Sequence, residues 1–167
     1  DKSRYHRILV VGENADFCLT KYGGSSGVKA RYEVMPIDAI QKIAGNDVKI
    51  EYRKGDTSDW PRNTQVEDSL RIDALKAADK ADLIVFIGGH NKHPCHDCES
   101  YDRGSTKAPY RQDELLVELL KAKAPLVLVT MGANQFDMPY SGKIPAMLHA
   151  WYGGSESGTA LAQVLFG

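Results

Sequence analysis

The side chains of this sequence that could do chemistry are concentrated in one polar segment, residues 88–109. Its first half packs three His, two Cys and two acidic residues into ten positions. Imidazole, thiolate and carboxylate groups all bind zinc, so His90, His93, Cys95 and Cys98 are candidate metal ligands. The second Cys pair that structural zinc sites usually supply is absent. The alternative is a polar surface loop in which these side chains are incidental.

The second half of the segment places two carboxylates beside a cation. Glu99 and Asp102 stand three residues apart, and Arg103 follows directly. An arginine next to Asp102 would hold that acid ionised and oriented, which leaves Glu99 as the carboxyl group that can exchange a proton. The arrangement thus allows acid–base chemistry, which spacing alone does not establish. The alternative is an exposed ion pair in a solvated loop.

A third candidate is the glycine-rich stretch at residues 23–27, which contains Gly24, Ser25 and Ser26. It lies about eleven residues after the first apolar run, too late to open a helix directly from a strand as phosphate binding requires. No dinucleotide fingerprint follows that run either, and no cofactor is expected. The stretch is either a plain turn or the lining of a pocket where close backbone approach needs glycine.

The elements that must position these residues follow from the apolar pattern. Short β-branched runs predict strands, and spacings of three and four predict helices between them. The predicted strands are residues 8–11, 48–52, 83–87, 126–129 and 146–151, and the predicted helices are residues 36–44, 66–78, 115–120 and 160–165. This alternation predicts an open doubly wound, mostly parallel sheet of about five to six strands with helices on both faces, a flavodoxin-like α/β sandwich. Ligands bind at the carboxyl ends of such strands, where residues 12–28, 88–109 and 152–157 form loops.

Composition limits the classes of function. The 167 residues fit one domain, residues 1–167. With 21 Lys and Arg against 22 Asp and Glu, the charge balance gives no basic surface for a nucleic acid partner. No apolar run approaches the roughly 20 residues that a membrane span needs.

Taken together, the motifs occur in a recognisable order. The sequence reads ILVVGENAD at residues 8–16, ESYDR at residues 99–103, WYGGSESG at residues 151–158 and ALAQVLFG at residues 160–167. Over nearly the whole chain this order resembles the C-terminal α/β sandwich domain of glycoside hydrolase family 3, the β-glucosidase and β-xylosidase family. The resemblance implies a retaining β-glycosidase that acts on a β-linked glucoside or related oligosaccharide, and that is secreted or periplasmic.

The resemblance also implies roles for individual residues. Glu99 matches the position that supplies the general acid/base in many members, while Asp102, Arg103 and the loop with Gly24, Ser25 and Ser26 would shape the sugar site. The nucleophilic Asp of the family belongs to a preceding (β/α)₈ barrel of about 250 residues, which this chain does not contain. The isolated chain is therefore expected to be inactive.

Two other functions are compatible with the same residues. One is a stand-alone carbohydrate-binding or interaction module, in which the loops contact sugar without turnover. The other is a zinc-binding domain that uses the His and Cys ligands named above.

Overall fold

The computed structural model describes residues 4–21, 23–93, 103–135 and 137–167. In these ranges five parallel strands form one sheet in the order β2-β1-β3-β4-β5. The strands are β1 (Arg7–Val11), β2 (Lys49–Arg53), β3 (Leu83–Gly89), β4 (Leu126–Met131) and β5 (Ala146–His149). This is the flavodoxin-like strand order, and it confirms the predicted fold class.

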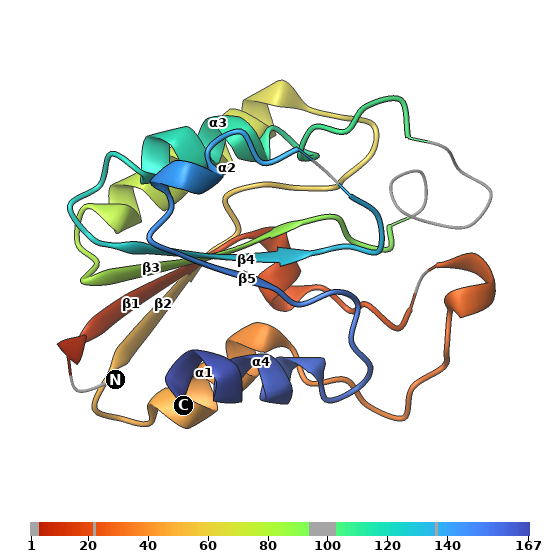
Figure 1. Ribbon diagram of the computed structural model, residues 1–167, viewed down its shortest axis with the longest axis horizontal. Coiled ribbons are helices and arrows are strands. Elements are labelled where there is room, and N and C mark those ends of the chain that lie inside the picture. The colour runs from red at the N-terminus through yellow and green to blue at the C-terminus, as the bar shows by residue number, and fades with distance from the viewer. Residues whose placement is uncertain (1–3, 22, 94–102, 136) are drawn as a thin grey trace.

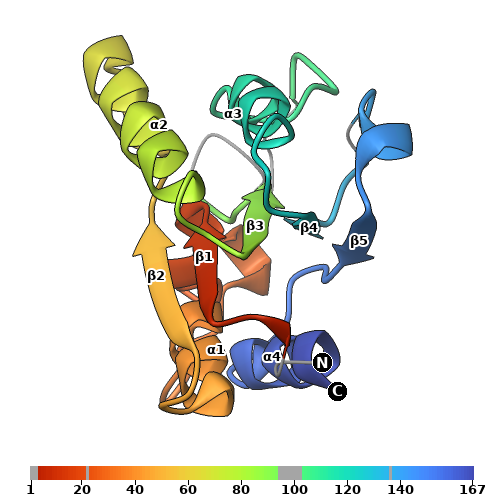
Figure 2. The same ribbon diagram turned by 90° about the vertical axis from the view of Figure 1, so that its left-hand side faces the viewer.

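Helices cover both faces of the sheet (Figures 1 and 2). α1 (Pro36–Ala44) and α4 (Ser157–Phe166) pack together on one face, and α2 (Thr64–Ala78) and α3 (Gln112–Leu119) lie on the other. Within the described ranges, no helix is long and apolar enough to cross a bilayer.

The continuous apolar runs form strands because a central parallel strand is buried on both faces. In β1, Ile8 and Val10 belong to the core under α1 and α4, whereas Leu9 and Val11 belong to the core under α2 and α3. Successive side chains of a strand point to opposite faces, so one apolar run serves two cores.

Local signals set the helix ends. α1 begins with Pro36 at its first position and ends before Gly45, which has a φ of +71°. Proline fits the first helical turn because its missing N–H has no partner there, and glycine tolerates the left-handed backbone that ends a helix. α2 begins two residues before the predicted Val66, because the Asn63 side chain accepts hydrogen bonds from the backbone N–H groups of Gln65 and Val66.

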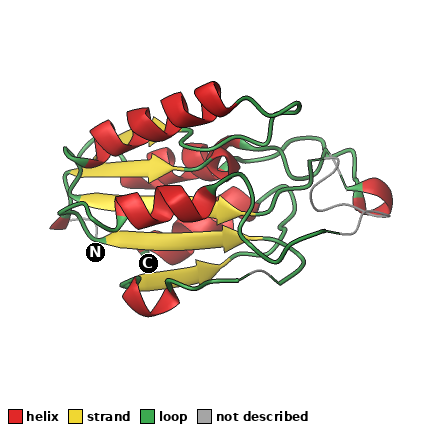
Figure 3. Ribbon diagram, turned by 90° about the horizontal axis from the view of Figure 1, so that it is seen from above, coloured by secondary structure: helices red, strands yellow, loops and turns green. Residues whose placement is uncertain are grey.

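All strands point the same way, so the loops that follow them gather at one edge of the sheet (Figure 3). β3 is longer than predicted and includes Gly88 and Gly89, which pair with Thr130 and Met131 of β4. The polar segment of residues 88–109 therefore leaves the sheet at His90. At this point it lies next to β1 and β4, the strands on either side of β3.

Candidate functional site

Those predicted site residues that the structure describes fall on two neighbouring loops at the carboxyl edge. Gly24, Ser25 and Ser26 form an exposed 3-10 turn, Gly24–Ser26, in the loop after β1. His90 and His93 follow β3 directly. Four predicted residues lie outside the described ranges: Cys95, Cys98, Glu99 and Asp102. Their predicted roles are not tested by the geometry.

Arg103 joins the ends of two strands. Its guanidinium contacts Nε2 of His90, which is buried at the end of β3, and donates to the backbone oxygen of Gln135, after β4, at 2.5 Å. The sequence predicted that Arg103 orients Asp102, and this stays a prediction because Asp102 lies outside the described ranges. In the described part of the chain, no three His, Cys, Asp or Glu side chains are placed so that they could hold a metal ion.

A buried polar cluster that the sequence analysis did not predict lies beneath this edge. Gln112, the first residue of α3, donates from Nε2 to Asp56 Oδ2 at 2.5 Å and to the Gly89 oxygen at 3.1 Å, and its Oε1 accepts the Gly89 N–H at 2.7 Å. Asp56 Oδ1 accepts the backbone N–H of Glu13 at 2.8 Å. Gln112 therefore fastens the end of β3 to the loops after β1 and β2.

Glu13 extends this cluster toward the surface. Its Oε1 lies 2.9 Å from Lys54 Nζ, and its Oε2 accepts the Ser58 N–H at 2.7 Å and the Asn91 amide at 3.4 Å. Asn91 Oδ1 in turn accepts the Tyr110 hydroxyl at 3.0 Å. Both stems of the loop after β3 are thereby fixed. In the sequence, the feature that pointed to this buried cluster was the polar stretch ENAD, residues 13–16, which follows the buried strand β1.

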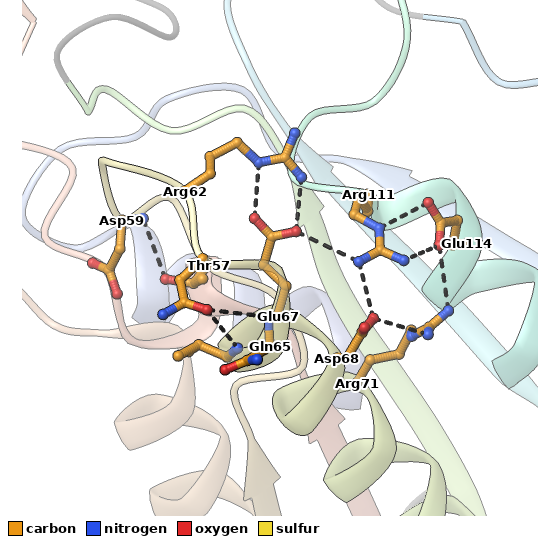
Figure 4. Close-up of polar contacts among 11 residues, drawn as sticks. Thr57, Asp59, Arg62, Gln65, Glu67, Asp68, Arg71, Arg111 and Glu114 are labelled. Carbon is orange, nitrogen blue, oxygen red and sulfur yellow. Dashed lines mark hydrogen bonds and ion pairs between the residues drawn. The ribbon is translucent and has the colours of Figure 1, made fainter.

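Ion pairs hold the point where this loop joins α3 (Figure 4). Buried Glu67 accepts from two nitrogens of Arg62, at 2.8 and 2.7 Å, and its Oε2 lies 3.6 Å from Arg111. Arg111 also pairs with Asp68 at 2.9 Å and with Glu114 at 2.6 Å. The bond from Arg62 holds the pKa of Glu67 below its usual value. The network anchors α2 and α3 to each other at their first turns.

The backbone has positive φ angles at the two residues that precede α3. Tyr110 and Arg111 have φ values of +57° and +59°, in the left-handed region that costs a non-glycine residue about 1 kcal/mol or more. The ion pairs of Arg111 and the hydrogen bond from Tyr110 to Asn91 hold the two residues in this conformation. Beside them lies a cavity of about 510 Å³, lined among others by Arg62, His90, Arg103, Lys107, Tyr110 and Glu114.

The pKa of Asp56 leads to a pH prediction. Burial raises it from 3.8 to about 7, against the N–H donors from Glu13 and Gln112 that favour the carboxylate. The folded protein then carries a proton that the unfolded chain has lost between about pH 4 and pH 7, so the free energy of unfolding falls across this window, by up to about 4 kcal/mol. Above pH 7 this contribution stays constant.

Urea unfolding at a series of pH values checks this prediction. Asp56→Asn should be less stable overall, because an amide nitrogen would face the Gln112 amide nitrogen, yet its stability should lack the decline between about pH 4 and pH 7. Asp59→Asn removes a carboxyl whose side chain is 76% exposed and should keep the wild-type pH dependence. An Asp56→Asn variant with the wild-type pH dependence would contradict the prediction.

The fold and this edge together define an α/β sandwich domain, in which polar loops meet at the carboxyl ends of a parallel sheet. The model of the glycosyl hydrolase family 3 C-terminal domain matches residues 2–167. The chain therefore belongs to this family of domains, as the motif order indicated.

Comparisons with individual proteins support the same family assignment. The β-glucosidase BoGH3A of Bacteroides ovatus is 40% identical over 99% of this chain, which aligns to 23% of that protein. The periplasmic β-glucosidase of Salmonella typhimurium is 30% identical over 96% of this chain and 23% of its own length. The crystal structure of a Bifidobacterium adolescentis β-glucosidase superposes with a TM-score of 0.81 at 25% identity, over 99% of this chain and 23% of its own. The chain thus spans about a quarter of the length of these relatives.

Proposed function

We propose that this chain is a domain of a retaining β-glycosidase of the β-glucosidase type, in which it forms one wall of the active site and supplies Glu99 as the acid/base. The observation that carries the proposal is the family match over residues 2–167, in which the motif ESYDR stands between β3 and α3 in the sequence. Ligands of doubly wound sheets bind at this edge.

In the proposed reaction the domain contributes half of the catalytic pair. A retaining glycosidase needs two carboxyl groups about 5–5.5 Å apart, one of which attacks the anomeric carbon while the other protonates the leaving oxygen. Glu99 would protonate that oxygen and then deprotonate the water that releases the sugar. Asp102, Arg103 and the turn Gly24–Ser26 would contact the sugar. The nucleophile would come from a barrel domain of the same polypeptide.

The two edges of the sheet support the presence of further protein in the working enzyme. The β2 edge is charged, with Glu51 paired to both Arg7 and Arg53. The β5 edge carries no such ion pair in the described ranges and exposes Met147 and, just beyond the strand, Trp151. Natural proteins protect the edge strands that face solvent, commonly with charged side chains, so an apolar edge favours contact with another segment.

The substrate class we propose is a β-linked glucoside or related oligosaccharide. The names of the relatives support this choice, because β-glucosidases and a β-xylosidase are among them. A secreted or periplasmic location is supported by the relative that is named as periplasmic.

Hydrolysis of aryl β-glucosides by the full-length polypeptide, compared with residues 1–167 alone, tests the proposal. We expect the full-length protein to hydrolyse them and to release the β-anomer first, as seen by NMR, whereas the isolated chain should show no turnover. Hydrolysis by the isolated chain, or initial release of the α-anomer, would contradict the assigned mechanism. Sugar binding without turnover by the full-length protein would instead support the stand-alone binding module.

A further inference from the structure

The loop that carries the turn Gly24–Ser26 is fastened at its base by one carboxylate, Glu33. Its Oε1 accepts the Leu19 N–H at 2.6 Å, and its Oε2 accepts the N–H of Thr20 at 3.0 Å and the hydroxyl of Thr20 at 2.6 Å. The Cys18 thiol donates to the same Oε2 at 2.9 Å. One half-buried side chain thus binds the outgoing end of the loop to the returning end.

The tip of the same loop is held from the other side by Lys92. Its Nζ donates to the Ser26 oxygen at 3.3 Å and lies 5.7 Å from the centroid of the Tyr152 ring. Lys92 belongs to the loop after β3, and Tyr152 belongs to the loop after β5. Lys92 therefore connects the loops after β1, β3 and β5.

Hydrogen bonds within the loop shape the turn itself: the N–H groups of Ser26 and Gly27 donate to the oxygens of Gly23 and Gly24, and the Val28 N–H donates to the Thr20 oxygen at 3.1 Å. Gly24, Ser25 and Ser26 are exposed, and Val28, which follows them, is 64% exposed. Exposed loops with little buried apolar surface open at low free-energy cost, and glycine adds backbone freedom. The position of the turn against the rest of the edge is therefore set by polar contacts, which include those of Glu33 at the base and Lys92 at the tip.

We infer that Glu33 and Lys92 are positioning residues, which hold the turn Gly24–Ser26 in place before a sugar arrives. This inference rests on the proposed function, because it needs a sugar that contacts the turn. Neither residue is assigned a contact with substrate. Their effect is to remove the ordering cost that a loose loop would add to binding.

The ionisation state of Glu33 is consistent with its role as the acceptor of these hydrogen bonds. Partial burial of Glu33 opposes ionisation, but the hydrogen bonds from Cys18 and Thr20 outweigh it and hold the pKa of the carboxyl below its usual value. The group is thus a carboxylate at neutral pH, the form that accepts several donors at once.

Steady-state kinetics of Glu33→Gln in the full-length enzyme test the inference. The amide of Gln keeps one acceptor oxygen but replaces the oxygen that binds Thr20 and Cys18 with a donor, so the base of the loop should loosen. Since a wall that contacts the sugar equally in the ground and transition states affects binding alone, we expect KM for an aryl β-glucoside to rise about tenfold with kcat nearly unchanged. Glu51→Gln, which removes a carboxylate bound to Arg7 and Arg53 on β2, should leave KM unchanged.

Lys92→Met provides a second variant that leaves the base intact. It should raise KM less than Glu33→Gln does, and the double variant should be no worse than Glu33→Gln alone, because a tip contact cannot order a loop whose base is free. Amide hydrogen exchange of residues 23–27 should be faster in both single variants and unchanged in Glu51→Gln.

The outcomes separate this inference from the proposed function. If the wild type hydrolyses β-glycosides but Glu33→Gln and Lys92→Met keep its KM, the inference is overturned while the function stands. Faster hydrogen exchange with an unchanged KM has the same meaning, because the turn would then be ordered for a purely structural reason. If the wild-type enzyme hydrolyses no β-glycoside, both the function and the inference fail.

Discussion

Glu99→Gln in the full-length enzyme should reduce kcat/KM for β-glucosides with poor leaving groups, such as alkyl glucosides, by about 10²- to 10⁴-fold. A poor leaving group needs a proton as the glycosidic bond breaks, and the Gln amide cannot supply it. A dinitrophenyl glucoside needs little such help, so its first step should be nearly unaffected. Its turnover should instead be limited by release of the glycosyl-enzyme, because water loses its general base.

Azide provides the decisive measurement for Glu99. As an anionic nucleophile it needs no general base, so it should restore turnover of the dinitrophenyl glucoside and yield a β-glucosyl azide. Asp97→Asn removes another carboxyl from the same segment and should leave both substrates near wild-type rates. Equal losses on both substrates, without rescue by azide, would assign Glu99 a role other than acid/base.

Gly89→Ala should destabilise the domain by more than about 4 kcal/mol and prevent its accumulation as a soluble protein. Gly89 has a φ of +92°, and an added Cβ would lie 2.1 Å from the backbone oxygen of Met131. That oxygen belongs to the neighbouring strand β4, so it cannot move without separating the strands. The same glycine exchanges hydrogen bonds with the buried Gln112 side chain, and its displacement would break those as well.

Two other glycines separate the contributions of strain and clash. Gly45 has a φ of +71° but open space around its Cα, so Gly45→Ala should cost about 1 kcal/mol from backbone strain alone. Gly154 does not have a positive φ, and a Cβ added to it would meet no atom within 4 Å, so Gly154→Ala should change stability by about 0.5 kcal/mol or less. The yield of soluble protein, together with urea unfolding followed by circular dichroism for the variants that are soluble, orders the three variants. If Gly89→Ala has the same free energy of unfolding as Gly154→Ala, the predicted clash between residue 89 and the Met131 oxygen of β4 is wrong.

The fold was largely predictable because its signals are local. A β-branched apolar run of four residues such as residues 8–11 can be buried on both faces only in a central strand, and Pro36 with Gly45 sets both ends of α1. The order of the short motifs then indicated the family, which the match over residues 2–167 confirmed. The strand ends were less predictable, since β3 continues to Gly89 only because β4 and Gln112 are present to pair with it.

The sequence by itself thus determined the class of fold, the family and the segment in which Glu99, Asp102 and Arg103 stand. Only the tertiary structure decided which polar side chains hold the candidate site. Gln112 and Asp56 are 56 positions apart, and Lys92 and Ser26 are 66 apart, so no local periodicity relates them. Polar residues in loops look alike in a sequence whether water or a distant partner satisfies them, and it is the packing of the strands that brings such partners within hydrogen-bonding distance.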